Sequence, residues 1–301
     1  MAGVRELTEL QALIAAHAVP GAPWTTLPGV KALKATAPSA PFCSIYQPAF
    51  GLVVQGAKRS VLNDRLFDYG AGQYLVVSVD LPAMGHVTEA TPEKPYLAMS
   101  MVLEPATIAS LLLETGAGPS AEGAAGLAVS DAPADLLDSV TRLMRLLDRP
   151  GDVPVLLPLL RREIHWRLLN GPQGGTIRQI GLADSRLSQV ARAIAHIRTH
   201  FAEPLSMEAL ARLAGMSGAS FNRHFRAVTA MSPLQFQKQV RLQEARSRLL
   251  TSAEDAAAIG FAVGYSSASQ FTREYGRLFG APPARDMSRL RKVPAVERGL
   301  A

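Results

Sequence analysis

The chain has 301 residues, of which 48% are hydrophobic and 19% charged, and its formal net charge is +6. This length is enough for two domains with cores of their own, and no uninterrupted apolar stretch reaches the roughly 18 residues that a membrane span needs. The single cysteine, Cys43, excludes a disulfide framework within the chain and favours a reducing compartment. We therefore expect a soluble, cytoplasmic protein without a membrane partner.

The positive charge is concentrated in the last third of the chain. Residues 188–301 hold 16 Lys and Arg against 8 Asp and Glu, whereas residues 1–187 hold 15 against 17. A basic segment attached to a slightly acidic body is typical of a protein that binds a polyanion. Charge alone leaves open a solvated basic face without any partner.

The first part of the chain is predicted to form strands after one short helix. Residues 1–19 read as an amphipathic helix, and residues 41–103 contain short apolar runs separated by Gly and Pro. A turn is expected at Asn63-Asp64. In the run at 95–103 alternate residues share one face, namely Leu97, Met99, Met101 and Leu103. This pattern predicts a small β-barrel or sandwich.

Helical spacing replaces the strand pattern after residue 105. Helices are predicted at 105–115, 133–148 and 154–169, the last with Pro158 inside its first turns. The densest group of helix breakers follows at 170–175. We therefore divide the chain into a first domain at 1–175, a linker at 176–188 and a second domain at 189–301.

The second domain carries signals for two helix-turn-helix units. In the first unit, Ser206 is a good N-cap, Gly215-Met216-Ser217 suits a tight turn, and a helix follows at about 218–228. Ser232-Pro233 then begins a long helix that is expected to end near Leu250. The second unit has its turn at 264–267 and its second helix at 268–279.

The two units repeat one pattern at an offset of 50 residues. The first reads Phe221-x-Arg223-x-Phe225, then Pro233 and Val240-Arg241; the second reads Phe271-x-Arg273-x-Tyr275, then Pro283 and Leu290-Arg291. Each unit has an apolar face that predicts a core and a polar face that is free to point outward. Two similar helices on a basic background indicate a protein that reads two adjacent major-groove segments of DNA.

The candidate DNA-contacting residues lie on the outward faces of these two helices. They are Ala219, Asn222, Arg223, Arg226, Ser269, Gln270, Arg273 and Arg277. The arginines can pair with guanine or with phosphates, and Ala219 can contact a thymine methyl group. We expect Phe221, Phe225, Phe271 and Tyr275 to be core residues.

From about residue 190 to 291 the chain resembles the DNA-binding domain of AraC-type transcriptional regulators. The resemblance lies in Leu210-Ala211, Gly215-Met216-Ser217, Ser232-Pro233 and above all the run from Ala262 to Tyr275. It implies a connecting helix that holds two reading units at fixed spacing, promoter DNA and RNA polymerase as partners, and a role as an activator or a repressor, between which the sequence does not decide. Two residues depart from the family pattern: Gly260 stands where Ala is usual and Asp286 where an aromatic residue is common.

Residues 25–175 resemble the cupin-like sensor domain that precedes such DNA-binding domains. The resemblance lies in 44–48, 53–56, 69–75 and 79–82. It implies a small barrel that binds a small-molecule effector and can form a homodimer. The fold class expected for the whole chain is therefore α+β, a cupin-like β-barrel with helices followed by an all-α tandem helix-turn-helix domain.

Within the barrel, the candidate effector contacts are Tyr46, Tyr74, Met99 and Met101. Met adapts to varied shapes, and Tyr combines an apolar ring with a hydroxyl that can form hydrogen bonds. A solid core around the two methionines is the alternative. Because residues 66–93 contain no Lys or Arg, we expect a neutral, mostly apolar effector.

Three other functions are less consistent with the sequence. A metal-dependent cupin enzyme needs clustered ligands, but His86 and Glu89 lack a His-x-His pair nearby. A DNA-modifying enzyme that uses Cys43 lacks a clustered site, and an architectural DNA-binding protein would not need the large first domain. We expect neither an enzyme nor a bound cofactor or metal, and a ligand-responsive regulator as the function.

Overall fold

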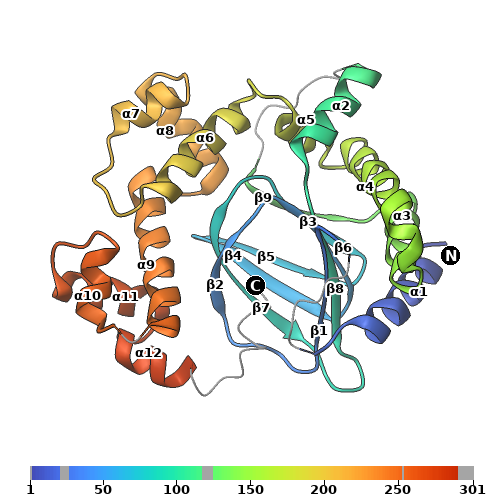
Figure 1. The fold of residues 1–301 in the computed structure, drawn as a ribbon, viewed down its shortest axis with the longest axis horizontal. Helices are drawn as coiled ribbons and strands as arrows, with labels where there is room; N and C mark the ends of the chain where they lie inside the picture. The colour runs from blue at the N-terminus through green and yellow to red at the C-terminus, as the bar shows by residue number, and fades with distance from the viewer. Residues whose placement is uncertain (1, 21–26, 117–124, 253, 291–301) are drawn as a thin grey trace.

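The computed structural model describes residues 2–20, 27–116, 125–252 and 254–290 (Figure 1). It has the α+β class that the sequence predicts. Two sheets face one another at the centre of the view and form the barrel. Helices α1 to α5 lie beside it, and the all-helical part, α6 to α12, lies on the opposite side.

The pairings between the strands of the two sheets are antiparallel. The five-stranded sheet has the order β1-β8-β3-β6-β9, with strands at Val30–Ala35, Tyr96–Val102, Ala49–Gln55, Gln73–Val77 and Leu127–Asp131. The four-stranded sheet has the order β2-β7-β4-β5, with strands at Phe42–Tyr46, Leu81–Glu89, Ala57–Leu62 and Arg65–Gly70. The expected turn between β4 and β5 is present, and Asn63 adopts a left-handed conformation there with φ 55°.

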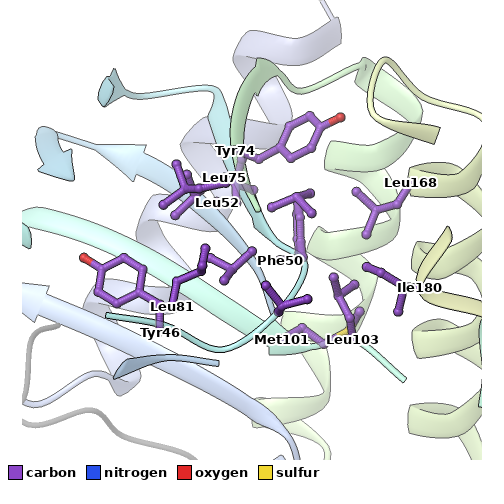
Figure 2. Close-up of a cluster of buried hydrophobic side chains, with 14 of the residues drawn as sticks. Tyr46, Phe50, Leu52, Tyr74, Leu75, Leu81, Met101, Leu103, Leu168 and Ile180 are labelled. Carbon is purple, nitrogen blue, oxygen red and sulfur yellow. The ribbon is translucent and has the colours of Figure 1, made fainter. Parts of the chain in front are cut away.

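Strand β8 is buried on both faces rather than on one. Met99 and Met101 are buried as predicted, but Tyr96 and Ala98 on the opposite face are buried too. Figure 2 shows the reason for one of these faces: Met101 and Leu103 lie on the side of the sheet where the helical layer places Leu168 and Ile180. The alternation in the sequence therefore identified one of the two buried faces of this strand.

Five helices cover the N-terminal part. They are α1 (Ala2–His17), α2 (Pro105–Thr115), α3 (Ala134–Met144), α4 (Val153–Leu169) and α5 (Gly174–Gly181). The prediction at 133–148 corresponds to α3 followed by the 3-10 turn η1 (Arg145–Asp148), and a second such turn, η2 (Pro150–Asp152), precedes α4. The segment predicted to link the two domains, 176–188, holds most of α5 and the start of α6.

The C-terminal part has the tandem arrangement that the sequence predicts. Its helices are α6 (Arg186–Thr199), α7 (Met207–Leu213), α8 (Gly218–Thr229), α9 (Pro233–Thr251), α10 (Ala256–Ala262), α11 (Ala268–Phe279) and α12 (Pro283–Leu290). Ser206 caps α7 as expected, and Ser232 forms a capping box with Gln235 at the start of α9. The last residue of the repeat, Arg291, lies outside the described residues.

The two parts are packed against each other. One continuous apolar core runs from the barrel through the first helix-turn-helix unit to Val240, and the second unit has a separate core. The backbone amide of Gly126 donates to the carbonyl of Val228 at 3.0 Å. Arg198 on α6 forms an ion pair with Asp80 of the barrel. Helix α9 also contacts strands β2 and β7.

Candidate nucleic-acid interface and ligand cavity

Helix α8 separates its apolar and polar residues onto opposite faces. Phe221 and Phe225 are fully buried, with ring centroids 5.5 Å apart. The side chains proposed to contact DNA on this helix are all exposed, namely Ala219, Asn222, Arg223 and Arg226. A helix anchored by aromatic residues and capped by Ser217 therefore presents a polar face to the solvent.

Helix α11 repeats this arrangement, with one difference. Ser269, Arg273 and Arg277 are exposed, and Phe271 is fully buried beneath them. Gln270 is only half-exposed because its side-chain amide donates to Glu274 Oε1 at 3.2 Å. The amide also carries a second N–H and a carbonyl oxygen, so it can contact a base while this hydrogen bond stays in place.

Glu274 forms the centre of a small polar cluster on α11. It also accepts hydrogen bonds from Lys238 Nζ at 3.1 Å and from the Tyr265 hydroxyl at 2.9 Å. Its burial raises the pKa of the carboxyl group, but the donors Gln270, Lys238 and Tyr265 outweigh burial and keep the pKa below its ordinary value. The ionised carboxylate therefore ties α11 to α9 and to the turn before α11.

His224 on α8 has a role that no sequence pattern indicated. Its Nε2 atom lies 2.5 Å from a guanidinium nitrogen of Arg186 and 3.5 Å from one of Arg223. Burial, and then the charges of Arg186 and Arg223, lower the pKa of its ring. The neutral ring accepts a hydrogen bond from Arg186 and so links α8 to α6.

Helix α9 connects the two units through side chains that bind backbone carbonyls. Arg241 donates from Nε to the carbonyl of Phe201 at 2.6 Å and from Nη1 to that of Gly264 at 2.8 Å. Gln237 donates to the carbonyls of Phe201 and Glu203 at 3.0 and 2.7 Å. Since Gly264 belongs to the turn of the second unit, Arg241 fixes that turn to the loop before α7.

The turn at Gly264 could not accept a larger residue. Its φ is +95°, and a Cβ atom there would lie 2.3 Å from the carbonyl oxygen of Ala202. Glycine alone fits both the backbone conformation and this contact. The close approach brings the Gly264 carbonyl within reach of Arg241.

The unusual Asp286 is accommodated by a buried ion pair. It is fully buried, and its carboxylate accepts from Arg246 Nε at 2.8 Å and from the Tyr275 hydroxyl at 2.9 Å. The guanidinium of Arg246 lies 4.4 Å from the ring centroid of Phe279 and 5.3 Å from that of Phe42. Arg246 therefore pairs with the buried carboxylate of Asp286 and connects the second unit to β2.

A cavity of about 260 Å³ lies within the barrel. Its apolar wall includes side chains from both sheets, among them Val30, Leu33, Ile45, Val53, Leu75, Val77 and Ala98. Two of the four predicted effector contacts, Tyr46 and Met99, line it. The other two, Tyr74 and Met101, are fully buried and lie outside the set of lining residues. Tyr74 instead packs on Phe50 with a centroid separation of 5.5 Å.

One end of the cavity is polar. The Tyr46 and Tyr69 hydroxyls each lie 3.2 Å from Ser60 Oγ, and the Lys58 ammonium lies 5.5 Å from the centroid of the Tyr46 ring. A Cβ atom at Gly85 would lie 2.0 Å from the Tyr46 hydroxyl, so only glycine leaves space for this cluster.

The position of Lys58 bears on one expectation from the sequence, that of a neutral effector. Burial opposes its charged form, whereas Tyr46 and Tyr69 beside it favour that form and raise the pKa of Lys58 above its ordinary value. The sequence argument for a neutral effector considered residues 66–93, whereas this cation comes from β4, which precedes them. The absence of Lys and Arg from residues 66–93 is therefore no guide to the charge of the cavity, because Lys58 lines it.

The part of the chain that the structure describes contains no group of three or more His, Cys, Asp or Glu residues that could hold a metal ion. None of its helices is long and apolar enough to cross a membrane. Burial and the nearby Asp286 raise the pKa of the Cys43 thiol to about 11, although Arg246 opposes them. The thiol is therefore protonated and weakly nucleophilic at neutral pH.

Two family models match the chain. The model described as the AraC-type transcriptional regulator N-terminus matches residues 26–176, and the model of a helix-turn-helix domain matches residues 210–289. The first match covers the barrel with α2 to α4, and the second covers most of the tandem units.

Curated relatives match over part of their length. The HTH-type transcriptional regulator ArgR of Pseudomonas aeruginosa is 27% identical over 119 residues, which are 40% of this chain and 35% of that protein. The RCS-specific HTH-type transcriptional activator RclR of Escherichia coli is 35% identical over 88 residues, which are 29% and 31% of the two chains. The matched region thus spans about a third of each relative.

A solved structure shares the whole architecture. ToxT from Vibrio cholerae, solved with an unsaturated fatty acid bound, aligns over 86% of this chain and 93% of its own, with a TM-score of 0.54 and 8% identity. This likeness shows a common fold of barrel and tandem helical units.

Proposed function

Since this chain belongs to the family of AraC-type transcriptional regulators, we propose that it binds promoter DNA through α8 and α11 and that a small molecule in the barrel cavity changes this binding. The two helices enter adjacent major-groove segments about one helical turn, or roughly 34 Å, apart. The observation that carries the proposal is the pair of repeated helices with exposed arginines above buried aromatic residues.

The exposed polar faces of α8 and α11 suit the recognition of a base sequence. Arg223 and Arg273 occupy matching positions in the repeat and are both exposed, and an arginine in the major groove pairs with guanine through two hydrogen bonds. The basic balance of residues 188–301 adds attraction to phosphates. The hydrogen bonds from Arg241 and Gln237 hold the units at fixed spacing, as reading two groove segments requires.

The effector part of the proposal rests on strand β2. Ile45 and Tyr46 line the cavity, and Phe42 on the same strand contacts Arg246 of α9. A ligand that displaces β2 would therefore change contacts with the helix that joins the two units. This arrangement supports coupling between the cavity and the DNA-binding part.

The remaining partners follow from the family and belong to the same proposal. We expect contact with RNA polymerase, action as an activator, and a homodimer formed through the N-terminal part. A DNA partner fits the cytoplasmic location that the single cysteine suggests. We expect no catalytic activity, since binding alone accounts for the two sites described above.

The proposal is tested by selecting genomic DNA fragments with the purified full chain in the presence of excess non-specific DNA. The expected result is enrichment of fragments that share a sequence motif in two parts. A matched selection with the chain carrying both Arg223→Ala and Arg273→Ala should lose the motif. If the unmodified chain enriches no shared motif, sequence-specific regulation is wrong for this protein.

A further inference from the structure

We propose that the cavity binds an organic acid, whose carboxylate contacts the Lys58 ammonium and the tyrosine hydroxyls and whose apolar body fills the rest of the barrel. This inference rests on the proposed function, in which the cavity is the effector site. It adds the chemical class of the effector.

The polar end of the cavity is built to hold an anion. Lys58 is 9% exposed, and its ammonium is hydrogen-bonded to Tyr46. Tyr46, Tyr69 and Tyr96 are buried side chains of the cavity wall, and the first two lie beside this cation. A carboxylate accepts hydrogen bonds from ammonium and phenol groups, and such charge-assisted bonds are about twice as strong as neutral ones.

The hydrogen-bonded hydroxyl groups at the polar end of the cavity remain available as donors to a ligand. The Ser60 hydroxyl bridges Tyr46 and Tyr69 at 3.2 Å on each side. Burial raises the pKa of Tyr69 and of Tyr96 above the ordinary value for a phenol. Both groups therefore keep their protons at neutral pH and can donate them to a ligand oxygen.

The number of buried cations favours a ligand that carries a single negative charge. Of the two lysines in the described part of the wall, Lys58 is buried and Lys31 is exposed on β1. One buried ammonium matches one carboxylate, whereas a phosphate dianion would bring a second charge into an apolar space. The apolar residues of β3, β6 and β8 favour a hydrocarbon body attached to that carboxylate.

The test measures binding of acids and of their neutral counterparts to the full chain by calorimetry. The probes are butanoate, hexanoate, octanoate, benzoate and phenylacetate, each compared with its primary amide. At least one acid should bind, with an affinity about tenfold or more above that of its amide. Equal affinities for acid and amide, or the absence of binding by every acid, would overturn the proposal.

Three substitutions test whether Lys58 is the cation that binds the acid. Lys58→Met keeps the length and apolar stem of the side chain, so the fold should persist while the preference for acid over amide falls close to one. Lys58→Arg keeps the charge and should keep most of that preference. Tyr69→Phe removes one donor hydroxyl and should lower the acid's affinity several-fold. An unchanged preference in a folded Lys58→Met chain would contradict the assignment.

These measurements separate the inference from the function on which it rests. Acid binding is measured without DNA, and DNA selection is measured without acid. If the acids fail to bind but the chain selects a shared DNA motif, the effector class is wrong and the regulator remains. If an acid binds but no motif is selected, the regulator is wrong and the anion site remains.

Discussion

Residues two positions apart on the reading helices have opposite environments. Phe271 is fully buried against Tyr265 and Tyr275, with ring centroids 5.4 and 5.6 Å away, whereas Arg273 is exposed. The sequence indicates both environments because helical spacing separates the two residues onto different faces. A stability defect is therefore expected from changes at Phe271, and a recognition defect from changes at Arg273.

The substitution Arg273→Ala should weaken binding to the selected DNA by about 1–3 kcal/mol and relax the preference at one base pair. The reason is the loss of a two-bond contact with a base edge. Gel-shift titrations against a set of single-base variants of the site measure both effects. Arg65→Ala, on strand β5 of the N-terminal part, serves as a matched loss of an exposed arginine. Equal weakening on all sequences would show instead that Arg273 contacts a phosphate.

A buried histidine should make stability depend on pH. His165 is fully buried; its Nε2 accepts from the amide of Glu104 at 3.0 Å, and its Nδ1 lies 2.7 Å from the Arg161 carbonyl. Burial, as the largest effect, lowers the pKa of this ring below its ordinary value of 6.5. The unfolded chain therefore takes up the proton at a higher pH than the folded chain does.

The contribution of His165 is thus fully present above about pH 6.5 and is lost as the pH falls towards the lower pKa of the folded state. The free energy of unfolding should decrease from about pH 7.5 to about pH 5.5. His165→Gln should be less stable at the higher pH and show a shallower decrease. The same decrease in both proteins would exclude His165 as its source.

At the scale of an element, α10 shows why one departure from the family pattern is tolerated. A Cβ atom at Gly260 would lie 2.8 Å from Cδ1 and 2.9 Å from Cγ of Phe271. The ring of Phe271 is fully buried and packs against the rings of Tyr265 and Tyr275. Glycine in α10 therefore allows α11 to pack closely, although it weakens the helix itself.

The substitution Gly260→Ala should destabilise the chain despite the better helix propensity of alanine. Alanine adds up to about 1 kcal/mol of helix stability, whereas overpacking costs about 1–3 kcal/mol. Gly218→Ala is the matched control, since a Cβ atom there meets nothing within 4 Å at the start of α8. Thermal unfolding should show a lower melting temperature for the first variant alone. A gain in both would show that Phe271 can move aside.

Elements with strong local signals could be predicted, and those defined by long-range pairing could not. The helix at 268–279 was predicted with its observed bounds because an N-cap, a stop and a clear apolar face coincide. Strand β1 was missed because its residues, Val-Lys-Ala-Leu-Lys-Ala, mostly favour helices, and pairing with β8 is what makes it a strand. Strand β9 depends in the same way on β6.

The residues of the candidate sites divide in the same way, into those that local sequence signals place and those that only long-range contacts place. The exposed arginines of α8 and α11 follow from spacing within one helix, so the sequence placed them on the expected faces. Lys58 lines the cavity together with residues from other strands, and Arg246 pairs with Asp286, which is distant from it in the chain. No local sequence pattern reveals such contacts. Of the predicted cavity residues, Tyr46 and Met99 line the cavity, whereas Tyr74 and Met101 are fully buried and lie outside the set of lining residues.

At the scale of the whole molecule, the C-terminal part has the features of an independent binding unit that is also attached to the barrel. The second helix-turn-helix unit has its own core, while the first shares a core with the barrel. A fragment of residues 180–301 should therefore fold and bind DNA, but it should unfold at a lower temperature than the full chain. A melting curve of the fragment and of the full chain checks this; a fragment without cooperative unfolding would contradict it.

The binding of this fragment to DNA should also depend steeply on salt. Each phosphate contact releases counterions and contributes a slope of roughly −0.9 to the dependence of log affinity on log salt concentration. Titrations at several salt concentrations measure the slope for the fragment. A flat dependence would exclude an electrostatic role for the basic residues of 188–301.

The central claim is that two repeated helices read two adjacent groove segments, and a chemical footprint of the full chain on its selected DNA tests it most directly. We predict two protected major-groove segments about one helical turn apart. Arg223→Ala should weaken protection in one segment and Arg273→Ala in the other. A single protected segment, or loss of protection in the same segment with both variants, would contradict the account.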